Sequence, residues 1–189
     1  MKKLILAGVM LSLSACATTQ NTNDINVIAK APESVSLGGL SNEAATSKLL
    51  EALLNKSYLA TQAGPTAVAV KFANSEFILQ PSMNPDGIDR ILMNRFYAIH
   101  PKYVGSKEML VMISALNQKL SFAKFVVREK GAVIQVQGAA TFVDTISMEE
   151  IRRFILWTDE GLLRVGQSLP EGSKGVIKPI PVMSKVKAA

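Results

Sequence analysis

Two runs of strand-like segments, separated by one helical pattern, decide the fold class of this sequence. A first helix that Ser41 can cap is followed by a hairpin over 67–80 and a strand over 91–99. A second helix begins after Ser106, and a second hairpin over 125–143 leads into a last helix after Ser147. Strands in consecutive runs favour antiparallel pairing. We therefore predict an α+β fold, an antiparallel sheet packed against helices in the order α-β-β-β-α-β-β-α, over residues 41–169.

Local signals support two of these helices. Ser147 is followed three residues later by Glu150, which is the pattern of a capping box. Met109 and Met112 lie on the apolar stripe of the second helix, so we expect them to pack in the core. Near the end of that helix, Asn117 is best interpreted as a cap or a bridge to the next strand.

The first residues predict export. Two lysines precede an apolar run over 4–13, which is shorter than the ~20 residues that a membrane-spanning helix needs. Ser14 and Ala15 follow, and then Cys16, which is the only cysteine of the chain, so residues 13–16 resemble the lipobox of bacterial lipoproteins. The resemblance implies a lipoprotein signal peptide over 1–15 and a mature N-terminus at Cys16 that carries palmitate or a related acyl chain. An ordinary secretory cleavage site is the alternative.

The same resemblance bears on location. Ala17 follows the cysteine, whereas an Asp at this place marks inner-membrane retention in Gram-negative lipoproteins. We therefore expect an anchor in the bacterial outer membrane, on the periplasmic face rather than the surface. The polar composition of residues 16–40 predicts a flexible tether between the anchor and the domain.

The basic charge of the chain is concentrated at its ends. The net charge is +6, but residues 41–169 carry only +2. The tail over 170–189 contains four lysines and one glutamate, together with three prolines. Because the domain lacks a basic stripe, a nucleic acid is not an expected partner. We expect the apolar stretch over 177–182 to dock in extended form on its own sheet, on a second copy or on a partner.

No group of residues in the sequence predicts catalysis, a metal site or a bound cofactor. His100 is the only histidine, and it is interpreted as a loop or surface residue. Asp86 and Asp89 belong to a turn rather than a calcium loop, and Glu149 and Glu150 belong to a helix start. Trp157 lies off the apolar stripe of the last helix, so it either marks an interface or packs across a neighbour.

The predicted order of elements and the stretch over 115–125 resemble the YbjN-domain family. The similar pattern has an Asn in the helix before the hairpin, an aromatic-x-Lys-aromatic motif over 122–125, and a strand that closes over 141–144 before a capped helix. The resemblance covers roughly residues 45–165. It implies the fold of the type III secretion chaperones and a compact protein-binding module, often dimeric, whose sheet is available to partners.

Two functions remain open from the sequence. The first is a lipid-anchored, non-enzymatic module of the cell envelope that binds a protein partner or a second copy in a chaperone-like or regulatory role. The alternative is a carrier or sensor of an apolar small molecule or lipid, held between the sheet and its helices. The apolar content of every strand suits such a ligand, but a packed core needs the same content.

Overall fold

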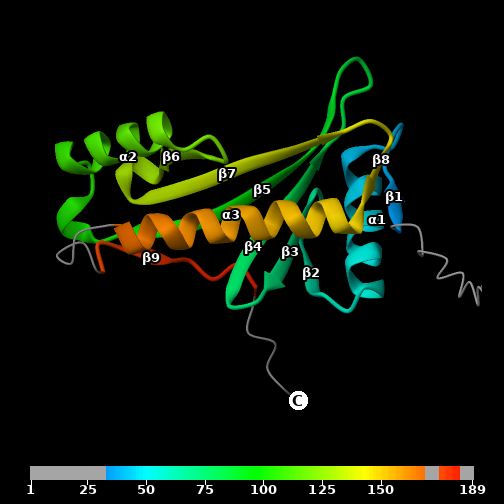
Figure 1. Ribbon diagram of the computed structural model, residues 1–189, viewed down its shortest axis with the longest axis horizontal. Helices are drawn as coiled ribbons and strands as arrows, with labels where there is room; N and C mark the ends of the chain where they lie inside the picture. The colour runs from blue at the N-terminus through cyan, green and yellow to red at the C-terminus, as the bar shows by residue number, and fades with distance from the viewer. Residues whose placement is uncertain (1–32, 169–174, 184–189) are drawn as a thin grey trace, which may run out of the picture. The chain divides into compact units, whose positions relative to one another are not determined.

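A computed structural model describes residues 33–168 and 175–183 of the chain. In these ranges, helices pack against an antiparallel sheet of seven strands, which confirms the predicted α+β class (Figure 1). The helices are α1 (Asn42–Asn55), α2 (Lys107–Lys119) and α3 (Met148–Ser168). The sheet consists of β2 (Leu59–Gly64), β3 (Ala67–Phe72), β4 (Ser75–Ser82), β5 (Asp89–Ile99), β6 (Lys124–Arg128), β7 (Val133–Phe142) and β9 (Ile177–Pro179).

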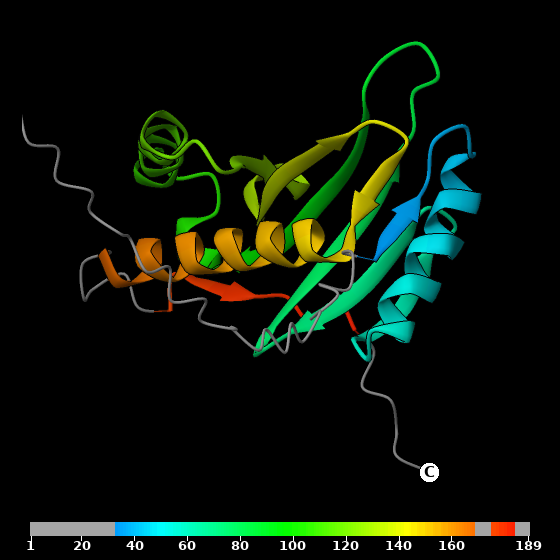
Figure 2. The ribbon, with the colours of Figure 1, turned by 45° about the vertical axis from the view of Figure 1, so that its right-hand side comes forward.

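The strands follow the order β2-β3-β4-β5-β7-β6, and β9 pairs with β5 outside this path. The two longest strands, β5 and β7, are antiparallel neighbours from Asp89 opposite Phe142 to Ala98 opposite Val133. All three helices pack on the same face of the sheet. Figures 1 and 2 show α3 crossing that face between α1 and α2.

The predicted helix starts are confirmed in atomic detail. The Ser41 hydroxyl accepts the N–H of Ala44 at 3.2 Å, and the Ser106 hydroxyl accepts that of Met109 at 3.2 Å. At α3 the capping box closes in both directions. The Ser147 hydroxyl accepts the N–H of Glu150, whose carboxylate in turn accepts the N–H of Ser147. These bonds satisfy N–H groups that the first turn of a helix leaves without partners.

Three short strands and one longer strand depart from the predicted order. β1 (Ser34–Ser36) pairs with β8 (Thr145–Ser147) in a separate two-stranded sheet, and β2 adds a fourth strand between α1 and α2. The expected tether over 16–40 therefore ends before Ser34, because Val35 and Leu37 are buried in the core. Residues 16–32 lie outside the described residues. β9 shows that the C-terminal stretch docks on its own sheet, the first of the three expected alternatives.

Apolar side chains of α3 contribute to two hydrophobic clusters. The first cluster lies beneath α1 and the first half of α3, where Ile151 and Ile155 meet strands β3, β4 and β5. The second lies between α2 and the second half of α3, with Met109, Ile113 and Leu162 among its members. Burying this much apolar surface is the main favourable contribution to folding.

Candidate functional site

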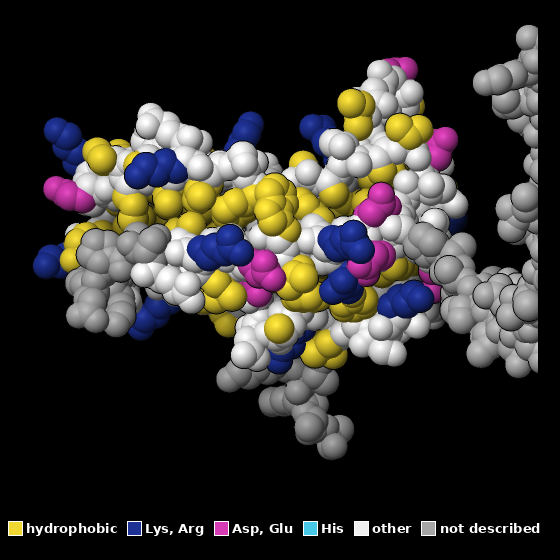
Figure 3. All heavy atoms as spheres, in the orientation of Figure 1, with side chains coloured by type: hydrophobic (Ala, Val, Ile, Leu, Met, Phe, Trp, Pro, Cys, Tyr) yellow, Lys and Arg dark blue, Asp and Glu magenta, His cyan; other side chains and the backbone are white. Residues whose placement is uncertain are grey.

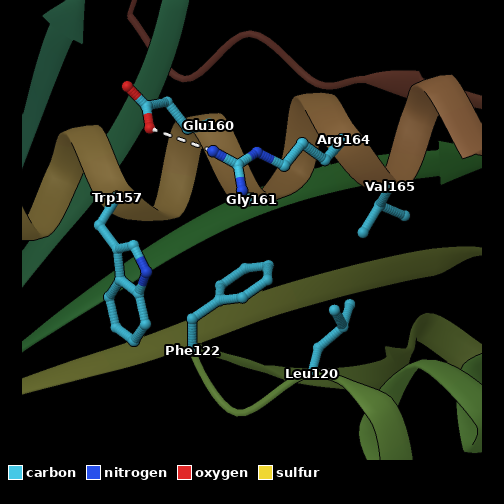
Figure 4. Close-up of a pocket in the computed structure, with 7 residues that line it drawn as sticks. All are labelled: Leu120, Phe122, Trp157, Glu160, Gly161, Arg164 and Val165. Carbon is cyan, nitrogen blue, oxygen red and sulfur yellow. Dashed lines mark ion pairs between the residues drawn. The ribbon is translucent and has the colours of Figure 1, made fainter.

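An open groove runs between α3 and the segment that joins α2 to β6, and it encloses about 390 Å³ (Figure 4). Its lining residues are Leu120, Phe122, Trp157, Glu160, Gly161, Arg164 and Val165. Figure 3 shows the same region as a continuous band of hydrophobic side chains beside the charged ridge of α3. The groove is therefore mainly apolar and has its charged groups along one margin.

The spacing of residues along α3 places the helix side of the groove. Trp157, Gly161, Arg164 and Val165 occupy positions i, i+4, i+7 and i+8, which share one face of a helix. On the other side, α2 ends at Lys119, and the chain turns so that Leu120 and Phe122 point toward α3 (Figure 4). The groove is thus formed by one helix and one short connection.

Gly161 allows the connection to approach α3 closely. A Cβ atom at this position would lie 2.7 Å from two carbons of the Phe122 ring, closer than such atoms approach. The ring of Phe122 also meets the ring of Trp157 edge to face, with centroids 5.9 Å apart. An aromatic pair thus forms the floor of the groove at this end.

Trp157 has an unusually large exposed surface for a tryptophan. It is 54% exposed, although a tryptophan side chain carries a large apolar surface. Of the two interpretations left open by the sequence, the structure shows packing across a neighbour, since the ring contacts Phe122, and it leaves the ring half-exposed. The margin of the groove carries one exposed ion pair, between Glu160 and Arg164 at 3.9 Å, so it has no net charge.

A buried polar cluster holds α3 against the sheet behind this groove. The carboxylate of Asp159 accepts a hydrogen bond from Arg95 at 2.9 Å and one from the Ser75 hydroxyl at 2.7 Å. The guanidinium of Arg95 lies over the rings of Phe77 and Tyr97, at 5.4 and 5.3 Å from their centroids. Burial raises the pKa of the Tyr97 hydroxyl above its ordinary value of 10.0. The cluster links β4, β5 and α3.

Sequence reasoning did not single out Arg95 or Asp159. A signal was present, because Arg95 lies two residues from the apolar Met93 and Tyr97 and therefore shares the inward face of the strand with them. Asp159 likewise lies four residues after the buried Ile155 on the inward side of its helix. Two opposite charges at inward positions indicate a buried pair, but only the fold shows that they meet.

The candidates considered for chemistry remain apart from one another. His100 is exposed, and its Nδ1 accepts the N–H of Lys102 at 3.3 Å at the start of a short 3₁₀ turn. Asp89 accepts the N–H of Asn84 within the turn after β4, as a turn residue does. The Arg152 and Arg153 side chains bind Glu149 and lower its pKa to about 2. Within residues 33–168 and 175–183, no three metal-binding side chains come together.

Of the two roles expected for Asn117, a cap or a bridge to the next strand, the structure shows the bridge. The side-chain amide of Asn117 donates to the carbonyl oxygen of Phe125 at 2.9 Å and accepts the N–H of Phe125 at 2.8 Å. The side chain thereby pairs with the outer edge of β6 as a neighbouring strand would. This contact positions the connection that carries Phe122, so Asn117 supports the groove indirectly.

A second hollow, of about 640 Å³, lies between the start of α1, the turn after β4 and the end of β7. Its amide and carboxylate groups serve the local fold. The side chain of Asn42 accepts the N–H of Met83 at 2.8 Å, and Asp89 is used in the turn described above. The groove beside Trp157 is consequently the better candidate for binding.

No family model matches the chain, and neither the curated proteins nor the solved structures include a significant match. Among the described helices, none has the length and apolar character required to cross a membrane. The predicted lipidation residue, Cys16, lies outside the described residues. The groove and the cluster behind it are therefore the features on which a function can be argued.

Proposed function

We propose that this protein is a lipid-anchored, non-enzymatic module of the cell envelope that binds another protein through the groove beside Trp157. The observation that carries the proposal is the half-exposed tryptophan in a groove with an apolar floor. Tryptophan is enriched among the residues that dominate protein–protein binding energies. The charged margin at Glu160 and Arg164 resembles the polar rim that surrounds the apolar centre of such interfaces.

The shape of the groove favours a protein over a small molecule. Sites for drug-sized ligands enclose most of the ligand surface, whereas this groove is open and leaves Trp157 54% exposed. The resemblance to the YbjN-domain family and to type III secretion chaperones agrees with a binding role and gives the proposal its chaperone-like or regulatory character.

A carrier or sensor of an apolar molecule is the second candidate function. The groove volume of about 390 Å³ supports it, because it falls within the usual range for small-molecule sites, ~300–1,000 Å³. Since Trp157 is the only tryptophan, its fluorescence reports directly on any occupant of the groove. Titration with a fatty acid or detergent monomer distinguishes this candidate, because a carrier should give a saturable blue shift.

The protein-binding proposal is tested by cross-linking in the envelope of the source cell. A photo-reactive amino acid placed at Arg164, on the margin of the groove, should form a defined adduct with one protein. The adduct should be lost in a Trp157→Ala background and retained in a Leu163→Ala background. Leu163 is the matched control, because it lies on the same helix with 57% exposure but does not line the groove. Equal adducts in both backgrounds would contradict the proposal.

The anchor is tested separately. Metabolic labelling with an alkyne-bearing palmitate analogue should mark the wild-type chain, and a Cys16→Ser chain should remain unlabelled and leave the membrane fraction. A labelled Cys16→Ser chain would contradict lipidation at this residue.

A further inference from the structure

Strands β4 and β5 separate from each other at one end and leave an edge of β5 for another strand. β3 pairs with the first part of β4, from Val68 opposite Leu79 to Phe72 opposite Ser75. Pairing between β4 and β5, however, begins only at Ile78 opposite Asn94. We call the space between residues 75–77 of β4 and residues 96–100, which are the end of β5 and His100, the slot. In the chain itself, residues 176–183 occupy the slot, and Figure 1 shows this segment on the side of α3 away from α2.

The slot binds its occupant mainly through backbone groups. The carbonyl oxygen of Phe96 accepts the N–H of Ile180 at 2.8 Å, and the N–H of His100 donates to the carbonyl oxygen of Val176 at 2.8 Å. Where β4 is no longer paired with β5, the carboxylate of Glu76 supplies the hydrogen-bond acceptor that a neighbouring strand would otherwise provide. It accepts the N–H groups of Val182 and Met183 at 2.8 and 3.0 Å.

The two prolines of the segment lie on its edge away from β5. In a β-strand, successive N–H groups point to opposite sides, and Ile180 donates to Phe96 of β5. Pro179 and Pro181 stand on either side of Ile180, so the missing N–H groups belong to the side away from β5. Proline at such positions loses no hydrogen bond within the sheet and blocks pairing with a further strand.

The segment is held with little side-chain burial. Of its described residues none is buried; Lys178, Pro179 and Pro181 are exposed, and the remaining residues are half-buried. By contrast, β4 buries every second side chain, including Phe77 and Leu79. Elements with few buried apolar contacts open at a small fraction of the global free energy of unfolding. The slot is therefore an accessible site despite its occupant.

We propose that the slot is a strand-acceptor site for an extended segment of a partner protein, which residues 176–183 keep closed in the chain alone. Such binding takes affinity from main-chain hydrogen bonds and specificity from alternate side chains. The partner segment needs an apolar residue opposite Ile99, where Ile177 lies, and another beside Phe96, where Ile180 lies. Its next residues need free N–H groups for Glu76.

This inference deepens the proposed function by adding a second protein-binding surface. The slot and the groove use different residues on opposite sides of α3, so either can fail alone. A Trp157→Ala chain should bind a strand partner in the slot as well as the wild type does, which separates the two proposals.

The experiment uses a fluorescently labelled peptide of residues 174–189 as the probe and full-length mature chains carrying Cys16→Ser. In the locked variant, Ala98→Cys and Lys178→Cys form a disulfide across a directly opposed, exposed pair. In the released variant, Ile177→Asp and Ile180→Asp weaken the binding of residues 176–183 in the slot and leave the residues of the slot itself unchanged. Lys178→Ala is the matched control, because its side chain is exposed.

Fluorescence anisotropy should show tighter binding of the peptide to the released variant than to the wild type, by about tenfold or more, because the competing closed state is removed. The locked variant should not bind until its disulfide is reduced, and the control should match the wild type. Equal binding to the locked and released variants would overturn the proposal. A released variant that fails to bind the peptide would overturn it as well. If hydrogen exchange shows residues 96–100 to be opened, the slot does not accept a strand; if they stay protected, residues 176–183 are not displaceable.

Discussion

Replacing Asp159 by Asn tests whether the buried polar cluster fixes α3 on the sheet. The substitution preserves the shape of the side chain and removes its charge. In the wild type the carboxylate binds both Arg95 and Ser75, and only 13% of the Arg95 side chain and 11% of the Asp159 side chain are exposed. The neutral amide of the Asp159→Asn chain leaves the guanidinium of Arg95 without its counter-charge in a region that water reaches poorly.

The expected loss of stability follows from this burial. Removing one partner of a buried ion pair costs about 3–5 kcal/mol, because the remaining charge stays desolvated. The rings of Phe77 and Tyr97 offset part of this cost, since a cation over an aromatic face gains ~0.5–2 kcal/mol. Those contacts remain in the Asp159→Asn chain and partly compensate the unpaired guanidinium, so we expect a decrease near the lower limit, about 3 kcal/mol. For a chain of 189 residues this lowers Tm by roughly 6–12 °C.

Urea unfolding followed by circular dichroism measures the effect. We expect Arg95→Met to lose less stability than Asp159→Asn, and the double variant Arg95→Met/Asp159→Leu to return to within about 1 kcal/mol of the wild type, because an apolar pair removes both desolvated charges. Glu160→Gln is the control on the same helix. Its exposed ion pair with Arg164 should contribute less than about 0.5 kcal/mol.

Two results would refute this reasoning. One is an Asp159→Asn chain within about 1 kcal/mol of the wild type, which would mean that water reaches Arg95 freely. The other is a double variant less stable than either single variant. That outcome would mean that packing shape rather than desolvated charge controls the site.

Three further predictions concern the groove and the helices. Gly161→Ala should move the Phe122 ring and shift Trp157 emission. A Cβ atom at Gly166 meets no atom within 4 Å, so Gly166→Ala should leave the emission unchanged and raise stability by up to about 1 kcal/mol. Equal emission in both variants would contradict the close approach of Phe122 to Gly161. Asn117→Ala should lower stability by about 1–3 kcal/mol and increase hydrogen exchange at Phe125, and unchanged exchange there would rule out the bridge. The Arg152 and Arg153 hydrogen bonds lower the pKa of Glu149 from 4.5 to about 2. The contribution of Glu149 to stability is therefore complete above pH 4.5 and disappears as the pH falls toward 2. Glu149→Gln should reduce the change of Tm with pH over that interval, and an unaltered pH profile of Tm would contradict the assignment.

Elements with local signals could be predicted from the sequence. Ser41, Ser106 and Ser147 start helices where their side chains accept the first free N–H groups, a bond made within three residues. The hairpins over β3–β4 and β6–β7 follow from alternating apolar residues around short turns. The bridging role of Asn117 was also predictable, because its partner is only eight residues away.

Elements that depend on distant partners could not be predicted. β1 is a strand because it finds β8, more than a hundred residues later in the chain. β2 is composed of residues such as Ala60, Gln62 and Gly64 that have weak strand preference, and it forms because β3 offers an edge. The groove likewise depends on a tertiary approach, since Phe122 and Gly161 meet only after α3 has packed on the sheet.

The position of the polar cluster explains how one helix can support two separate binding surfaces. Arg95 and Asp159 lie where the two hydrophobic clusters meet, between Met93 and Tyr97 on β5 and between Ile155 and Leu162 on α3. Apolar contacts alone permit a helix to slide or rotate with small changes in energy, whereas a hydrogen-bonded pair has one register. Fixing that register aims Trp157 at the groove on one side of α3. It also holds Tyr97 and Ser75 at the entrance to the slot on the other side. A substitution at Asp159 should therefore disturb both surfaces, although it belongs to neither.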